Sequence, residues 1–225
     1  TADIIQTMKR GGFGVSFELS YAAQFEAWLE GLLGGAFTAN VLKVGTTRKS
    51  FTFERRFADA GQYLVHRGSI PARFSLNVAR GSIINGGMDF RSLFPTMSAS
   101  ALTGSSTTAV GTNPVMDPIS SVQLIQEGGA GAVAGPTEFS MELENGIIDL
   151  DQLASTDPLD MMLGELRARG RLALYFQDAT YFTKFANHTT TSLKLTVGGA
   201  SALNYEFLFN KVKLTAVDLP NQGKG

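Results

Sequence analysis

The residues that could carry out chemistry are few and widely spaced. The chain has no cysteine and only two histidines, His66 and His188. Without cysteine there is no thiol nucleophile, disulfide or thiolate zinc site. His66 lies in a strand-like run and His188 in a polar loop, and no Gly-x-Ser-x-Gly motif offers either a nucleophile. We interpret both as structural or exposed histidines rather than catalytic bases.

Other binding motifs are also weak. One acidic cluster comprises Asp149, Asp151, Asp157 and Asp160. It lacks the glycine and terminal glutamate of a calcium-binding loop, so we interpret these side chains as helix caps and solvated charges. The glycine-rich stretch 128–136 lacks the strand–helix context of a dinucleotide site, and 45–50 lacks P-loop spacing. The sequence therefore predicts a non-enzyme with no catalytic, cofactor or metal site and no small-molecule substrate.

Charge is unevenly distributed along the chain. Residues 1–115 hold 11 Lys/Arg and 7 Asp/Glu, whereas residues 116–225 hold 8 and 13, for a total of −1. The basic first half interleaves arginine with phenylalanine, which allows a nucleic-acid interpretation. We favour phenylalanines in a core and arginines facing solvent or a partner subunit, because the acidic strands later in the chain offset the positive charge of the first half. Such an asymmetry suits subunits that meet head to tail.

A stripe of like charge follows one segment. Glu138, Glu142 and Glu144 alternate with Phe139, Met141 and Leu143, as on a strand with one buried face. Three hypotheses remain open for the glutamates. They form a solvated sheet face, the wall of an aqueous channel that does not hold DNA, or salt bridges to a neighbouring subunit.

The elements that position these residues are mostly strands. The chain of 225 residues is 44% apolar and 17% charged, enough for one core or two small domains. Apolar residues alternate with polar ones in many segments, which favours antiparallel sheets. The apolar parity flips near Asn210, which predicts a bulge there. The alternating segments are 51–57, 73–78, 138–144, 171–177, 192–197 and 205–214.

Two segments have helical spacing. Residues 21–33 place Phe25, Trp28, Leu29 and Leu32 on one stripe, with Ser20 as the cap and Gly34 as the stop. Residues 158–169 repeat the spacing with Leu159, Met162, Leu163 and Leu166, after Asp157 as the cap. We predict two short amphipathic helices.

The remaining segments read as loops. Residues 95–120 show no period and form a long loop. Residues 128–136 read as a hairpin tip between strands 121–127 and 137–145. We expect one domain spanning residues 1–225, with flanking strands missing at both ends.

The order of these pieces resembles that of bacteriophage tail tube proteins from long-tailed phages. The resemblance covers roughly residues 10–220 and rests on an ordered set rather than one diagnostic motif. The segments that carry it are 14–20, 51–59, 62–63, 68–78, 139–146, 170–176, 193–197 and 205–214.

This resemblance implies an antiparallel β-sandwich or partly closed barrel. Subunits would form hexameric rings that stack into a hollow tube, in the virion tail, assembled in the bacterial host cytoplasm. The tape-measure and tail-terminator proteins would be partners, and genomic DNA would pass through without sequence-specific binding. We expect Glu138, Glu142 and Glu144 to face the lumen, with the 69–91 hairpin as the other candidate. Arg55, Arg56 and Asp59 are the expected subunit interface.

Two other functions remain open. The chain could be the tube of a phage-tail-like particle, such as a bacteriocin or gene transfer agent. From a different class, it could be a monomeric β-sandwich that binds a ligand. An exposed aromatic platform would favour the binding module, but Trp28, the only tryptophan, is expected in the core.

Overall fold

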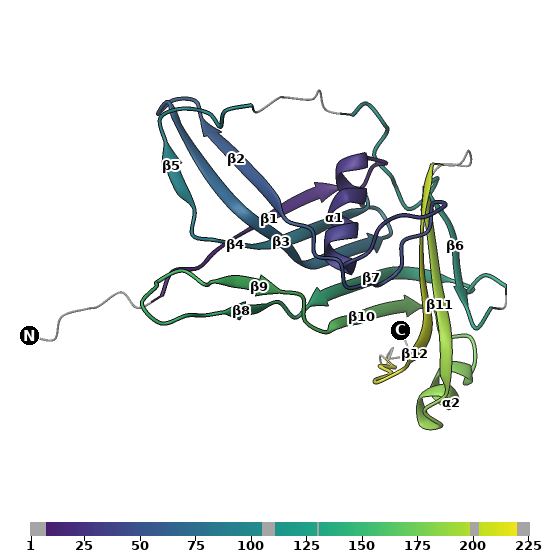
Figure 1. Cartoon of the computed structure of the whole chain (residues 1–225). Helices are drawn as coiled ribbons and strands as arrows, with labels where there is room; N and C mark the ends of the chain where they lie inside the picture. The colour runs from purple at the N-terminus through teal and green to yellow at the C-terminus, as the bar shows by residue number, and fades with distance from the viewer. Residues whose placement is uncertain (1–7, 105–110, 130, 199–202, 220–225) are drawn as a thin grey trace, which may run out of the picture. The chain divides into compact units, whose positions relative to one another are not determined.

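The computed structural model describes residues 8–104, 111–129, 131–198 and 203–219 (Figure 1). These residues form twelve strands and two helices, and neither helix has the length and apolar character needed to cross a membrane. In chain order the elements are β1 (Gly11–Glu18), α1 (Ala23–Leu33), β2 (Phe51–Phe57), β3 (Gln62–Ala79), β4 (Asn85–Ser92), β5 (Thr96–Ser98), β6 (Val122–Glu127), β7 (Pro136–Asn145), β8 (Ile148–Leu150), β9 (Asp160–Met162), β10 (Leu166–Leu174), α2 (Thr180–Ala186), β11 (Thr190–Gly198) and β12 (Asn204–Lys213).

The chain divides into two compact units. Unit 1 comprises Thr1–Asn77, Asn85–Pro114 and Ser140–Gly170, and unit 2 comprises Val78–Ile84, Val115–Phe139 and Arg171–Gly225. The largest sheet has seven strands in the order β1-β4-β3-β7-β10, with β2 and β5 also paired to β3. The register of β1 with β4 and of β3 with β4 is antiparallel, so the predicted mainly β, antiparallel chain is confirmed. The strand order of each described sheet is open, without closure into a barrel.

Helix α1 confirms the first helical prediction, with a later start. Its residues Phe25, Leu29 and Leu32 are buried, as the apolar stripe requires. Gly34 ends it in the left-handed conformation with φ 63°, which glycine adopts without steric cost. The predicted cap is wrong, because the N-cap is Ala22 and no side chain caps the helix.

Aromatic rings fill the core of unit 1. The Phe13 and Phe90 rings stack at 5.1 Å between centroids, and the Phe25 ring of α1 lies 5.7 Å from that of Phe74. Trp28 is half-buried and packs in a T-shaped contact against Phe90 at 5.5 Å, so it lies at the margin of the core and not on an exposed platform. The alternating phenylalanines of β1, β3 and β4 thus give the large sheet an apolar face covered by α1.

Unit 2 contains a three-stranded sheet in the order β12-β11-β6. Thr191 pairs with Val212 whereas Leu193 pairs with Phe209, so between these pairs one residue on β11 opposes two on β12. The extra residue lies between Phe209 and Val212, and this confirms the bulge predicted near Asn210. The bulge returns the apolar side chains on both sides of it to one face.

The helix predicted over 158–169 is wrong. The segment forms β9, a short connection and the start of β10. An added Cβ at Gly164 would lie 1.7 Å from the Gly146 carbonyl oxygen, so the extended chain passes Gly146 too closely for another residue. Met161 is the buried residue, while Leu159 and Met162 of the predicted stripe are exposed. Asp157 therefore caps no helix.

Two other local predictions change. The second helix is α2, which lies outside the predicted 158–169 segment and has no buried residue. Strands β6 and β7 occur close to the predicted bounds but lie in different sheets, so the predicted hairpin across 128–136 is wrong. The 95–120 segment includes β5, which pairs with β3 at Tyr63–Val65.

Candidate assembly surfaces

One face of the large sheet in unit 1 carries polar side chains and glycines. We call it the polar face, and it lies opposite the phenylalanine core. Cross-strand register aligns Gly14 with Asp89 and Asp89 with Arg73. The Asp89 carboxylate lies over Gly14, where an added Cβ would approach Oδ1 to 2.8 Å. The face includes Gly14 and Ser16 of β1, Gly87, Asp89 and Arg91 of β4, Arg73 and Ser75 of β3, and Glu142 and Glu144 of β7.

The glutamate stripe is partly neutralised within the chain. The Arg73 guanidinium donates a hydrogen bond to Glu142. That bond, followed by the attraction of Glu142 and then of Asp89 and Glu144, raises the pKa of Arg73. Arg73 is half-exposed, so the pair contributes about 0–1 kcal/mol to folding and mainly fixes two side chains.

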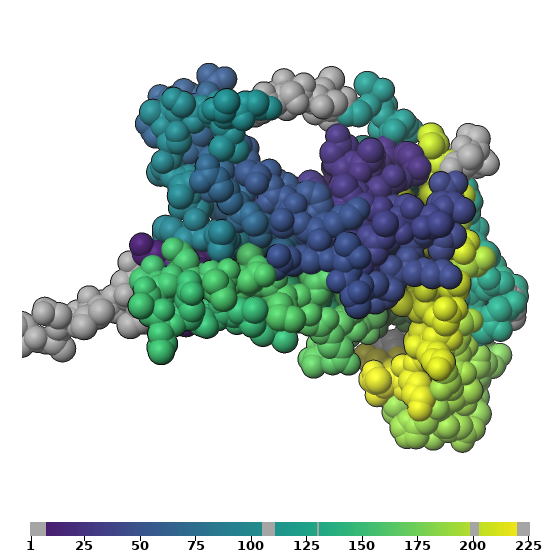
Figure 2. Space-filling view, in the orientation of Figure 1, coloured from purple at the N-terminus to yellow at the C-terminus, as the bar shows by residue number. Residues whose placement is uncertain are grey.

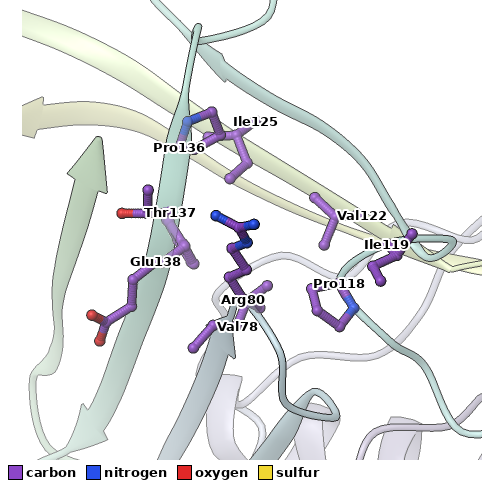
Figure 3. A pocket seen from close by; sticks show the side chains of 11 residues that line it. Val78, Arg80, Pro118, Ile119, Val122, Ile125, Pro136, Thr137 and Glu138 are labelled. Atoms are coloured by element: carbon purple, nitrogen blue, oxygen red, sulfur yellow. The ribbon is translucent and has the colours of Figure 1, made fainter. Parts of the chain in front are cut away.

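The three predicted glutamates do not form one group. Glu142 and Glu144 lie on the polar face of unit 1, whereas Glu138 belongs to unit 2 and lines a pocket there (Figure 3). The polar face therefore carries the carboxylates of Asp89, Glu142 and Glu144 together with the guanidinium groups of Arg73 and of Arg91, which lies two residues beyond Asp89 on β4.

The predicted interface residues lie at the end of the β2–β3 ribbon. Arg55 pairs in register with Leu64 and Arg56 with Tyr63, so the adjacent arginines point to opposite faces. Both are exposed, and their guanidinium carbons lie 5.0 Å from the Phe57 ring and 6.0 Å from the Tyr63 ring. Asp59 is exposed in the turn that joins the strands. The structure gathers the three on one ribbon but not on one face.

Arginines clamp the β8–β9 hairpin of unit 1. The Asp149 side chain is 5% exposed and bonds to Arg10 at 2.8 Å and to Arg91. Asp151 pairs with Arg10 at 2.8 Å, and Asp160 pairs with Arg48. Figure 2 shows this hairpin, in green, at the surface of unit 1. In the part of the chain that the structure describes, no group of three His, Cys, Asp or Glu side chains could hold a metal ion.

Neither histidine has catalytic surroundings. The His66 ring lies 3.2 Å from the Ser92 hydroxyl, but Ser92 is buried and donates to the Leu93 carbonyl at 2.9 Å. Burial lowers the pKa of His66, because it disfavours the charged form of the ring. His188 is exposed after α2. This geometry fits a packing role for His66.

The sequence reasoning missed the edges of the large sheet. Strands β1 and β10 end its strand order, so each has one edge unpaired with any other described strand. Arg167, Arg169 and Arg171 occupy alternate positions of β10 and are exposed. The alternation of these arginines along the sequence indicates a strand. It was missed because the helix predicted over 158–169 overlaps the start of β10. Charged side chains on an edge strand prevent indiscriminate pairing.

The chain also matches a family of known proteins. The sequence profile of a family described as phage tail tube protein matches residues 1–224. A comparison with curated proteins finds no match. The profile spans nearly the whole chain, including both units and every strand described above. The chain belongs to the phage tail tube protein family, whose members are structural components of the virion tail.

Proposed function

We propose that this chain is the structural subunit of a phage tail tube, in which hexameric rings stack into a hollow cylinder that conducts DNA to the host. The observation that carries the proposal is the large antiparallel sheet, which has a polar face and whose end strands β1 and β10 each have an open edge. An open edge is a row of unpaired backbone donors and acceptors. Joining the edges of successive copies satisfies these groups and makes a head-to-tail contact, which closes into a ring when its rotation allows.

The polar face supports a role as the lumen wall. Glycine and serine leave it without large side chains over much of its area, and Glu142 and Glu144 bring negative charge to it. DNA is held mainly by cationic contacts to phosphate, so carboxylates on a lumen wall weaken its retention and let it slide. We assign Glu142 and Glu144 to the lumen by this argument. Glu138 joins them only if unit 2 also borders the channel.

The exposed ribbon end supports a role between subunits. Arg55, Arg56 and Asp59 are charged, exposed and not ion-paired with any described residue of their own chain. Both units form one tail-tube domain in this proposal, and the subunit has no enzymatic activity. Its partners are other copies, a tape-measure protein inside the tube, a tail-terminator protein and passing DNA. Assembly takes place in the host cytoplasm.

The test is assembly of the purified chain. Negative-stain electron microscopy and sedimentation over a range of protein concentrations should show rings or hollow tubes of about 100 Å width, the size of about six such domains around a pore. The tubes should also form in the absence of nucleic acid. A chain that stays monomeric at every concentration contradicts the proposal.

A further inference from the structure

An exposed apolar knob stands at the tip of the β8–β9 hairpin. Leu153 is 98% exposed, so its side chain contributes no hydrophobic free energy to folding. The next residue, Ala154, has φ 62°, a left-handed conformation that costs a non-glycine residue about 1 kcal/mol or more. The Lys9 amide also donates to the Thr156 carbonyl at 2.7 Å. A leucine held outward on a strained turn is typical of a contact surface.

The knob carries one unpaired charge. Asp149, Asp151 and Asp160 of the hairpin are bonded to arginines of unit 1. Asp157 is exposed, and no described side chain forms an ion pair with it. The tip therefore presents a leucine and, four residues on, a free carboxylate.

Unit 2 contains a pocket whose chemistry complements that of the tip, since it combines an apolar wall with a cation. Its volume is about 290 Å³, and its walls are mostly aliphatic, from Pro118, Ile119, Val122, Ile125 and Pro136 (Figure 3). Ile119 stands on the rim, 90% exposed. The Asp117 carboxylate accepts hydrogen bonds from the Ile119 and Ser120 amides at 2.7 and 2.8 Å, which fixes the rim in place. A preformed rim lowers the entropy lost when a ligand is bound.

The pocket also holds one unpaired cation. The Arg80 side chain projects between the walls, while Glu138 points away from it (Figure 3). No described carboxylate lies within ion-pair distance of Arg80. The occupant that fits is therefore a small apolar side chain accompanied by a carboxylate, and the Leu153–Asp157 tip of a second copy presents both.

We infer that Leu153 of one subunit inserts into the Arg80 pocket of a neighbouring subunit, with Asp157 paired to Arg80. The inference rests on the proposed self-assembly and names a contact that drives it. The contact joins two different surfaces, so each copy offers one knob and one pocket and the chain of contacts can continue. Burying Leu153 and Ile119 removes two of the most exposed apolar side chains of the described chain from water.

The absence of natural cysteines allows a direct test. Leu153→Cys protein and Ile119→Cys protein, prepared separately and co-assembled, are oxidised and analysed on non-reducing gels. The matched control replaces Ile119→Cys with Leu208→Cys, an exposed residue of β12 outside the pocket. Both main substitutions lie at exposed positions, so the fold is retained, and circular dichroism checks this.

The expected result is a crosslinked dimer of the Leu153→Cys and Ile119→Cys proteins at several-fold higher yield than the control. Arg80→Asp should raise the critical concentration for assembly about tenfold, and adding Asp157→Arg to the same chain should restore it. Tubes that form without preferential crosslinking, or in which the Ile119→Cys thiol stays open to a thiol reagent, overturn the inference and leave the proposed function standing. A crosslink within one chain carrying both cysteines, in dilute monomer, also overturns it. If no assembly occurs, both proposals fail.

Discussion

The side-chain amide of Asn145 donates a hydrogen bond to the Leu32 carbonyl at 2.9 Å, across 113 positions of sequence. Its oxygen accepts from the Gly164 amide at 3.1 Å, and the whole residue is buried. One amide thus joins the end of α1, the end of β7 and the approach to β10 within unit 1. The Leu32 carbonyl is one of the helix-end acceptors that have no partner inside the helix.

Replacing this amide should destabilise unit 1. Asn145→Leu leaves the buried Leu32 carbonyl and the part-buried Gly164 amide without these partners, so the free energy of unfolding should fall by about 1–3 kcal/mol. Urea unfolding followed by tryptophan fluorescence measures this, since Trp28 packs against the same core. Asn113→Ala is the matched control, because exposed Asn113 also donates to a carbonyl, that of Tyr21. Equal unfolding midpoints for the two variants would contradict the assignment.

Acid should weaken unit 1 through His66. The ring lies 4.5 Å from the Phe13 ring, and burial lowers its pKa below the ordinary 6.5. The unfolded chain therefore binds a proton more readily than the folded chain, and stability falls as the pH drops from about 6.5 toward the folded-state pKa. His66→Gln should flatten the pH dependence of the unfolding midpoint in this range. His188→Gln serves as the control, and a slope unchanged by His66→Gln would refute the prediction.

Reversing the ribbon charges should block assembly without unfolding the subunit. Arg55→Glu with Arg56→Glu alters two exposed side chains, so the unfolding free energy should change by at most about 0.5 kcal/mol. Sedimentation should show the loss of large species at concentrations where the natural chain assembles. Lys43→Glu, at another exposed position of unit 1, tests whether net charge alone matters. Intact tubes from the double variant would remove these arginines from the interface.

Reversing the charge of the polar face should make the tube retain DNA. Glu142→Lys with Glu144→Lys places cations where we propose the lumen, and phosphate contacts then hold the duplex. Assembled tubes should bind DNA, and binding should weaken steeply as salt is raised. The matched variant is Asp178→Lys with Asp218→Lys, two exposed carboxylates outside the strands of the large sheet. Equal DNA binding by the two assembled variants would count against a lumen at Glu142 and Glu144.

Much of the fold follows from local pattern. Phe74, Leu76 and Val78 alternate with polar residues because a strand has a side-chain period of two, and β3 contains them all. Helix α1 follows from its stripe and from Gly34, and the bulge near Asn210 from a parity change. In each case the sequence pattern is local, because the geometry of a helix or strand alone decides which of its residues share a face.

The helix-like spacing of 158–169 shows the limit of that logic. Four apolar residues matched a helical stripe, yet Gly164 must lie against the Gly146 carbonyl and Arg48 donates to the Met161 carbonyl. These partners come from elsewhere in the chain, and tertiary contacts override a weak local preference.

Residue patterns were enough to predict an antiparallel β chain, its first helix, most strand faces and, through an ordered resemblance, its family. They could not predict which strands share a sheet, that Glu142 meets Arg73, or that Glu138 lies in a different unit from Glu142. Nor could they show that three aspartates of the acidic cluster form ion pairs with arginines. The physical reason is that a local pattern shows which side of its own strand a residue faces, whereas partners distant in sequence are chosen by packing the whole chain.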